Sequence, residues 1–423
     1  MGNFSRAGTR ILAPAENTGN RGVAPHAGGD FLPVAPSSAP MSMSHIHVQS
    51  AAEAEGLASE LASASRFALD CEAAGFHRYS DRLCLLQITV HERTYVVDPL
   101  AFDPADLLRG PLEDPNVAIV MHGSDFDLRL LSRDLGIRLH GLVDTQIQAA
   151  LLGEPALGLS SLLEARFGVK LSKKYQRADW AERPLTDGML EYAAADTRHL
   201  ERLTDMLAEE VEARGRTDWA IEEYRALEEV SDISRDDVEP EDPVVRVKGA
   251  RDLPPRHVAA IREALAWRDE IARSRDKAPF RVIGDKPLIE AAGLQPRRVE
   301  ELVDLQGFPS RLAREEGKSL LRRLRAVAEL PEADLVPYPR HIRRGPGRPP
   351  PELEELVDRL KGVRNQVADH VGLPKGTFLS NATLLEIARA APKTRDELLA
   401  VEGMRHWKAE VAGDRLLEIV RAG

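Results

Sequence analysis

Four carboxylates and one tyrosine stand out because their types and spacings suit metal chemistry. Asp70 and Glu72 are two residues apart in an apolar, strand-like run, so both side chains leave the same face of the strand. Burying two carboxylates is costly unless a cation neutralises them, and hard ions such as Mg²⁺ and Mn²⁺ prefer oxygen ligands. An exposed strand face would explain the pair equally well, so this pair alone leaves both interpretations open.

The next acid, Asp127, follows His122 where the apolar run VAIVMH turns into an amphipathic segment. Ser124 and Asp127 also have the spacing of a capping box at a helix start, so a purely structural role is an alternative. Asp125 is a competing acid that would lie half a turn or more away from Asp127 on the helix.

Tyr192 and Asp196 are four residues apart and share one face of a predicted helix. A tyrosine at this spacing more often packs in a core with its hydroxyl at the rim. The pair therefore gains its meaning only in combination with the other acids.

Hydrophobic patterns indicate which elements position these residues. From Arg66 the apolar runs FALDCEA, CLLQITV, TYVVDPL and VAIVMH alternate with helical stretches, which indicates an α/β sheet domain. Further helices are expected over 145–152, 159–167 and 186–212. Beyond Pro243 no strand alternation remains, and two helical blocks follow.

The two helical blocks are related to each other. A repeat of 96 residues indicates a duplicated small domain rather than a solenoid. The same shift places Val363 opposite Trp267, so the second copy lacks an aromatic side chain of the first. The identical pairs are Leu288 and Leu384, Glu290 and Glu386, Ala292 and Ala388, Pro296 and Pro392, Glu301 and Glu397, Leu302 and Leu398, and Gly307 and Gly403.

In chain order, the three acidic segments together resemble the tyrosine-containing (DEDDy) branch of the DEDD exonuclease superfamily. The stretches RLCLLQI, YVVDPL, LSKKYQRADWAERPL and YAAADTRHL look like those of ribonuclease D and of the catalytic subunit associated with the eukaryotic exosome. This likeness covers about residues 65–215. LAWRDEIARSRDKAPFRVIGDKPLIEAA resembles the helicase-and-RNase-D C-terminal (HRDC) domain, and 353–420 looks like a more diverged copy.

The resemblance implies an α/β fold: a ribonuclease H-like (DnaQ-type) mixed-sheet exonuclease domain followed by two small all-α HRDC domains. The first residues are rich in Gly, Pro, Ala, Ser and Asn, which predicts disorder. The expected boundaries are 1–43 for a disordered extension, 44–226 for the exonuclease domain, 227–246 for an acidic linker, 247–330 for HRDC domain 1, 331–350 for a Pro/Arg-rich linker and 351–423 for HRDC-like domain 2.

In that family the four carboxylates hold two divalent metal ions, and the resemblance gives these roles to Asp70, Glu72, Asp127 and Asp196. Mg²⁺ or Mn²⁺ is expected, with one ion activating water and the other stabilising the departing 3′ oxygen. Tyr192 would orient the water, because a phenol is a poor base at neutral pH. The implied activity is stepwise 3′-5′ hydrolysis of RNA to nucleoside 5′-monophosphates, with tRNA precursors as the expected substrates.

Substrate contacts are expected around these acids. The segment LSKKYQRADW interleaves cations with aromatic side chains, which suits phosphate contact and base stacking; a surface loop anchored by a buried Trp180 is the alternative. His122 is expected to be a hydrogen-bonded structural residue rather than a metal ligand, because a hard ion already has four oxygen donors. The candidate substrate-binding residues are Phe76, Gln87, His122, Lys173, Lys174, Tyr175 and Arg177.

Composition narrows the class of protein. No apolar run approaches the roughly 20 residues of a membrane span, and the N-terminus lacks a signal-peptide pattern, so a cytoplasmic monomer is expected. Cys71 and Cys84 are expected to be buried, reduced thiols. The net charge of -11 argues only mildly against nucleic-acid binding, because eight acids and one arginine are concentrated in Glu228–Asp242.

Two rival functions stay open. A DNA 3′-5′ exonuclease would use the same metal site, and RNA is favoured because of the paired HRDC-like modules; a contact to the 2′-hydroxyl would discriminate between the two polymers. A non-catalytic nucleic-acid-binding scaffold with a decayed site is disfavoured, because all five functional positions are present.

Overall fold

A computed structural model describes residues 45–231, 242–339 and 350–422. Residues 1–43, for which disorder is predicted, lie outside the described residues, as does part of each predicted linker. None of the described helices combines the length and the apolar character that crossing a bilayer requires.

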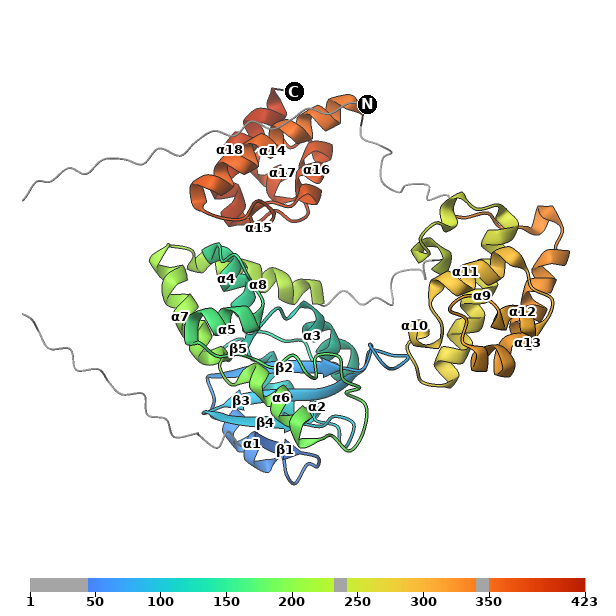
Figure 1. The fold of residues 1–423 in the computed structure, drawn as a ribbon. Coiled ribbons are helices and arrows are strands. Elements are labelled where there is room, and N and C mark those ends of the chain that lie inside the picture. The colour runs from blue at the N-terminus through green and yellow to red at the C-terminus, as the bar shows by residue number, and fades with distance from the viewer. Residues whose placement is uncertain (1–44, 232–241, 340–349, 423) are drawn as a thin grey trace, which may run out of the picture. The chain divides into compact units, whose positions relative to one another are not determined.

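A six-stranded mixed sheet lies at the centre of the α/β domain (Figure 1). The strand order is β1-β4-β3-β2-β5-β6, with β2 antiparallel to β3 and parallel to β5. The predicted α/β fold with a mixed sheet is confirmed. The strands are β1 (His45–Val48), β2 (Arg66–Ala73), β3 (Leu83–Val90), β4 (Arg93–Val97), β5 (Ala118–Met121) and β6 (Leu142–Asp144).

The central strands are apolar because helices cover both faces of the sheet. Every residue of β3 is buried, which is typical of a strand covered on both sides. In β2, Leu69 and Cys71 pack into one core while Ala68 packs into another. Cys71 and Cys84 are both buried and unpaired, as expected.

Eight α-helices accompany the sheet in the described part of this domain, and α6 packs across β1 to β4 (Figure 1). The predicted continuous helix over 186–212 is wrong, since α6 ends at Thr197. The buried Thr197 hydroxyl bonds with Thr89 Oγ1 at 2.8 Å, which fixes that end of α6 on the sheet. The helices are α1 (Glu55–Leu61), α2 (Ala105–Glu113), α3 (Asp125–Leu130), α4 (Thr145–Leu152), α5 (Leu159–Phe167), α6 (Asp187–Thr197), α7 (Leu200–Ala213) and α8 (Thr217–Ser231).

Two predicted boundaries differ from the observed elements. Helix α8 runs five residues past the predicted domain end at 226, so the first residues of the predicted acidic linker are helical. The start of the predicted Pro/Arg-rich linker folds back on the first helical module. There Tyr338 Oη donates to the Val245 carbonyl at 3.4 Å, and Arg262 donates to the Pro337 carbonyl at 2.8 Å.

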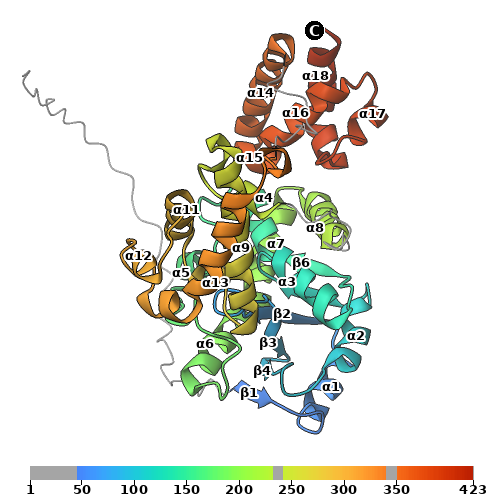
Figure 2. The same cartoon turned by 90° about the vertical axis from the view of Figure 1, so that its right-hand side faces the viewer.

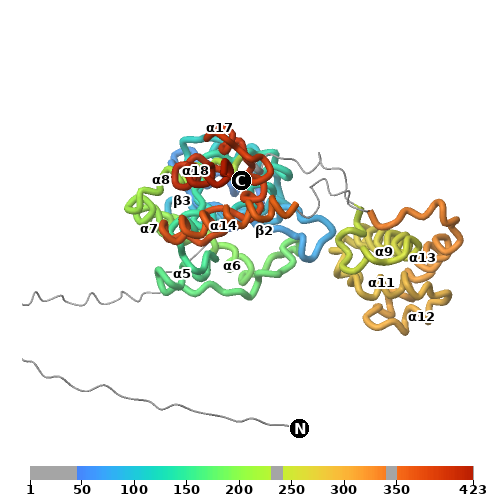
Figure 3. The backbone as a smooth tube through the Cα atoms, turned by 90° about the horizontal axis from the view of Figure 1, so that it is seen from above, coloured from blue at the N-terminus to red at the C-terminus, as the bar shows by residue number. Residues whose placement is uncertain are grey.

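Each helical module contains five α-helices, and every helix of the second module starts 96 residues after its counterpart in the first. In the first module α9 packs against α13, and in the second α14 packs against α18 (Figures 2 and 3). Gln295 and Ala391 occupy equivalent positions and both have a positive φ, 48° and 45°. The counterparts are α9 (Pro255–Ser274) and α14 (Pro351–Val371), α10 (Pro279–Val282) and α15 (Lys375–Phe378), α11 (Asp285–Leu294) and α16 (Asn381–Ala390), α12 (Val299–Val303) and α17 (Arg395–Leu399), and α13 (Ser310–Glu329) and α18 (His406–Arg421).

Candidate active site

The parallel pair β2 and β5 brings two acidic segments to one edge of the sheet. Ala68 of β2 lies opposite Val120 of β5. Asp70 and Glu72 follow at the carboxyl end of β2, and Asp127 lies in the first turn of α3, directly after β5. Because parallel strands end at the same edge, these side chains converge as the sequence suggests.

Helix α6 adds the third segment from the face of the sheet that carries Asp70. The small side chains of Ala193 and Ala194 are fully buried, which lets the helix lie close to the strands. One carboxylate oxygen from each of Asp70, Glu72 and Asp196 lies within 4.8 Å of the other two. Three of the four predicted metal ligands are therefore gathered tightly enough to share an ion.

Electrostatic repulsion makes these acids poor neighbours without a cation. Burial raises the pKa of the Asp70 carboxyl well above its ordinary value, and the nearby carboxylates of Asp127, Asp196 and Glu72 raise it further. Glu72 shows the same direction, from burial and then from Asp196 and Asp127. Burial also raises the pKa of Asp196 to about 7.

This donor set fits a divalent metal. In the part of the chain that the structure describes, none of these four acids forms an ion pair with a cationic side chain, and several oxygen donors around one point suit a hard cation. Asp70, Glu72 and Asp196 are only partly buried, which leaves them accessible to a ligand from solvent.

The fourth acid, Asp127, joins the group at longer range. Its side chain is 9% exposed, and burial followed by the charge of Asp144 raises its pKa to about 7. The capping-box alternative is wrong, because the Ser124 side chain makes no cap bond to α3. Ser124 Oγ instead donates to Asp144 Oδ2 at 2.9 Å.

Asp144 is a buried anchor that sequence analysis missed. It lies at the end of β6 and caps α4 by accepting from Gln146 N (2.7 Å) and Ile147 N (3.2 Å). It also accepts from Gly123 N (3.1 Å) and Ser124 N (2.9 Å) in the turn that leads to α3. The only available signal was an Asp immediately before a predicted helix, which indicates an N-cap but not the second loop.

Gln87 does not line a substrate pocket, so its predicted role as a substrate contact is wrong. It is fully buried and pairs with Asp70 across the antiparallel strands. With its amide nitrogen facing Asp70, Gln87 donates to Asp70 Oδ2 at 3.1 Å and to the Asp70 carbonyl at 3.0 Å. The Gln87 side chain therefore orients the Asp70 carboxylate.

Tyr192 lies between two other aromatic rings. Its ring centroid is 6.0 Å from that of Tyr175, edge-on, and 5.9 Å from that of Trp180. Trp180 is 2% exposed, so it anchors the segment as the structural alternative predicted. Burial, and then the charges of Asp196, Glu72 and Asp70, raise the pKa of the Tyr192 phenol, so it stays protonated at neutral pH.

A cavity of about 240 Å³ adjoins Tyr192 and Asp196. Tyr175 lines it, so this predicted contact opens toward the acids. Exposed Lys174 stacks its ammonium over the Tyr175 ring, 4.9 Å from the centroid. The remaining lining residues are Lys170, Leu171, Ser172, Gly188, Glu191 and Ala195.

The other predicted contacts lie outside the lining of this cavity. Lys173 is exposed, and the Arg177 guanidinium lies 5.6 Å from the ring centroid of Phe76, which is 40% exposed. His122 Nδ1 forms a 2.8 Å hydrogen bond with Thr145 Oγ1, as expected for a hydrogen-bonded residue, and its role toward substrate stays a prediction.

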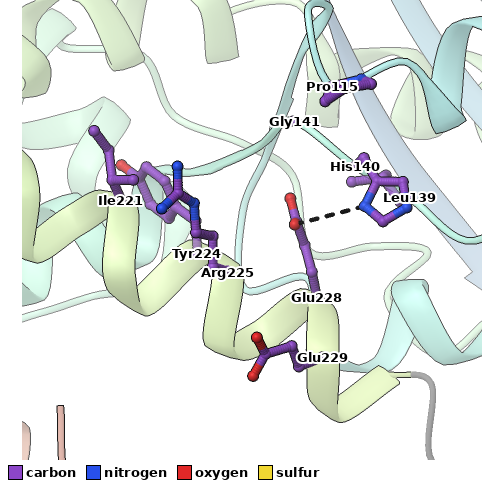
Figure 4. Close-up of a pocket in the computed structure, with 9 residues that line it drawn as sticks. All are labelled: Pro115, Leu139, His140, Gly141, Ile221, Tyr224, Arg225, Glu228 and Glu229. Atoms are coloured by element: carbon purple, nitrogen blue, oxygen red, sulfur yellow. Dashed lines mark ion pairs between the residues drawn. The ribbon is translucent and has the colours of Figure 1, made fainter.

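A second cavity, of about 470 Å³, lies beside α8 and the segment before β6 (Figure 4). Glu228 faces His140 there at 3.9 Å and accepts from Leu142 N at 2.8 Å. None of the four clustered acids lines this cavity. Its lining residues are Pro115, Leu139, His140, Gly141, Ile221, Tyr224, Arg225, Glu228 and Glu229.

Comparison with known proteins agrees with this geometry. A family described as 3′-5′ exonuclease matches residues 46–212, and the HRDC domain family matches 258–324 and 354–420. The protein is thus a 3′-5′ exonuclease that carries two HRDC domains, and the predicted second copy is confirmed.

The full-length relatives identify the family. The chain is 31% identical over 357 residues to ribonuclease D of Cronobacter turicensis, covering 84% of this chain and 94% of that protein. The crystal structure of Escherichia coli RNase D superposes with a TM-score of 0.65 at 27% identity, covering 90% of this chain and 99% of that one. The chain belongs to the ribonuclease D family, and it is a metal-dependent 3′-5′ exoribonuclease.

Proposed function

We propose that Asp70, Glu72, Asp127 and Asp196 hold two divalent ions, Mg²⁺ or Mn²⁺, and that RNA is shortened there from its 3′ end to nucleoside 5′-monophosphates. The observation that carries this proposal is the convergence of three acidic segments on one edge of the sheet. The raised pKa values of Asp70 and Glu72 support it. Burial and mutual repulsion destabilise the ionised carboxylates, and a bound divalent cation would stabilise them.

The chain's own residues divide the remaining work. Bound ions would supply Lewis-acid stabilisation of the charge that develops on the scissile phosphate. Tyr192 orients the attacking water through its protonated hydroxyl, since its pKa is too high for a base. The 240 Å³ cavity beside Tyr192 receives the terminal nucleotide, with the Tyr175 ring available for base stacking. Lys173 and Lys174 contact the phosphates that follow.

Structured RNA, with tRNA precursors foremost, is the proposed substrate in the cytoplasm, where the protein acts as a monomer. The support is by relationship: the similar Escherichia coli enzyme is described as an exoribonuclease involved in structured RNA processing. Two HRDC domains on the same chain add surface for RNA beyond the active site.

Matched RNA and DNA strands with free or blocked 3′ ends test the activity, with Mg²⁺, Mn²⁺ or EDTA. We expect mononucleotide release from free-ended RNA with metal, and a loss of 10³-fold or more in Asp70→Asn. Asp103→Asn is the matched control, because its carboxylate accepts one exposed backbone N–H, from Ala105 at 2.9 Å. Faster digestion of DNA, internal cleavage or activity in EDTA would each contradict the proposal.

A further inference from the structure

Helix α13 of the first HRDC domain carries a row of four cations, which we call the α13 basic stripe: Arg314, Lys318, Arg322 and Arg325. Their spacings of four, four and three residues place them on one face of the helix. All four side chains are exposed, while Leu320 and Leu324 on the opposite face are buried.

The stripe is unpaired, although acids are abundant nearby. In the part of the chain that the structure describes, none of its four cations has an ion pair or a hydrogen-bonded acid. Other cations of the same helix are neutralised within the domain. Arg323 binds Glu263 at 3.1 Å and Glu270 at 2.7 Å, and Arg311 binds Glu315 at 2.6 Å. Four residues after Arg325, the same face of the helix ends with an acidic residue, Glu329.

The duplicated module supplies an internal comparison. At the same shift of 96 residues, α18 presents Glu410, Asp414, Glu418 and Arg421 where α13 presents its stripe. Three of four positions have reversed charge, and all three acids are exposed. The buried faces have kept their apolar character, as at Leu320 and Leu416. The fold therefore tolerates either sign at these positions, so the stripe is not needed for folding.

We infer that the α13 basic stripe binds the phosphate backbone of the RNA substrate, and that the matching face of α18 does not. This inference rests on the proposed function. At 1.5 Å per residue the stripe is about 16 Å long, a length over which a stacked strand carries about five phosphates. Exposed cations that bind phosphates release counterions, which makes binding depend on salt.

Charge complementarity favours RNA over a protein partner. The side chains on the exposed face of α13 beside the stripe include Glu315 and Ala326 and no large apolar residue. A protein interface usually has an aromatic or aliphatic core, whereas a backbone contact needs only positive charge. The acidic face of α18 would repel the same polyanion.

The test measures binding of the full-length protein to a fluorescent 30-nucleotide RNA in EDTA, by anisotropy, from 50 to 300 mM KCl. The stripe variant is Arg314→Gln, Lys318→Gln, Arg322→Gln and Arg325→Gln together. Its control removes four exposed cations of the same domain that lie off α13, as Lys248→Gln, Arg251→Gln, Lys286→Gln and Arg297→Gln. Both variants change the net charge equally.

We expect the stripe variant to bind 10- to 100-fold more weakly at 100 mM KCl. The slope of log K against log salt should shrink by about 3, from about 0.7 per lost phosphate contact, while the control keeps most of its slope. Glu410→Lys, Asp414→Lys and Glu418→Arg together should steepen the slope, which tests the surface independently of any effect of the stripe substitutions on folding.

Equal losses in the stripe variant and its control would overturn the inference, as would unchanged RNA binding in the stripe variant. A stripe variant that loses binding only to polyglutamate would point to an acidic protein instead and would also overturn it. Mononucleotide release from a trinucleotide reports separately on the proposed function. If the wild-type protein fails there, the active-site proposal fails whatever the binding data show.

Discussion

At the scale of single residues, the active site is a set of acids that repel one another. Asp70 and Glu72 have raised pKa values because burial and neighbouring carboxylates both oppose their ionisation. The Gln87 amide offers the Asp70 carboxylate its only uncharged side-chain donor among the contacts described here. A metal ion would reverse the balance, since it stabilises the ionised form of each acid.

Tyr192→Phe tests orientation against proton abstraction. We expect kcat to fall by 10- to 1,000-fold with little change in KM, because the water loses a hydrogen-bond partner while the ring packing remains. The alkaline side of the pH–rate profile should not move, since the raised pKa keeps this phenol protonated. Tyr224→Phe, outside the cavity beside the acids, is the control and should leave kcat unchanged.

The pH dependence of stability should reveal the carboxylates directly. The pKa values of Asp127 and Asp196 rise from 3.8 to about 7 on folding, so the metal-free folded protein binds protons more tightly than the unfolded chain. Their contribution to stability is complete below about pH 4 and is lost as the pH rises to about 7.

In EDTA, Asp127→Asn should therefore melt several degrees above the wild type at pH 8 and close to it at pH 4. Adding Mg²⁺ or Mn²⁺ at pH 8 should raise the wild-type Tm more than that of the variant. A variant less stable than the wild type in EDTA at pH 8 would show that the charge of Asp127 does not destabilise the folded protein.

At the scale of elements, the site depends on the turn between β5 and α3. Asp144 holds this turn by accepting from two of its backbone N–H groups while also capping α4. Asp127 lies on α3, directly after this turn. Its position therefore depends on Asp144, at the end of β6.

Asp144→Asn should lower the free energy of unfolding by about 2–4 kcal/mol, because it removes buried charge-assisted hydrogen bonds. We also expect kcat to fall at least tenfold through displacement of Asp127. Asp103→Asn, at an exposed helix start, should cost less than 1 kcal/mol. Urea unfolding and mononucleotide release measure the two effects; full activity in Asp144→Asn would separate the turn from catalysis.

The left-handed residues at the ends of α11 and α16 are another element-scale feature. Gln295 and Ala391 adopt φ of 48° and 45°, a region that disfavours side chains. Gln295→Gly and Ala391→Gly should each raise the free energy of unfolding by up to about 1 kcal/mol. Ala390→Gly, one residue earlier in α16, should lower it by about the same amount, and equal signs at 390 and 391 would refute the argument.

At the scale of the whole molecule, salt should separate the active site from the RNA-binding surface. If the α13 basic stripe contributes four phosphate contacts, kcat/KM on a long RNA should fall roughly 50-fold between 50 and 200 mM KCl. A trinucleotide has too few phosphates to contact the active site and all four cations of the α13 basic stripe, so its kcat/KM should change only a few-fold. Parallel losses on both substrates would place the salt dependence in the active site.

Elements with an apolar run or a clear hydrophobic period were predictable from the sequence. Strands β2 to β5, α4 and α5 lie where the apolar patterns place them, and the shift of 96 residues holds for every helix pair of the modules. Strand β6 has only three residues, and β1 (HIHV) has two histidines among its four residues, so neither shows an apolar run like that of β5.

The acids of the site were predictable because residue type and chain order already constrain them. Long-range partners were not. Period-two alternation tells which side of β3 carries Gln87 but not that its register places it opposite Asp70. Likewise, α6 ends at Thr197, whose hydroxyl contacts that of Thr89, 108 residues earlier, and no local pattern signals this contact.

The three acidic segments also fix the order in which the enzyme is completed during its synthesis. Asp196 leaves the ribosome 126 residues after Asp70, a delay on the order of ten seconds at cellular translation rates. Until α6 has been synthesised, the nascent chain lacks Tyr192 and Asp196. A chain that ends before Asp196 therefore has at most three of the four proposed metal ligands, and we expect it to be inactive.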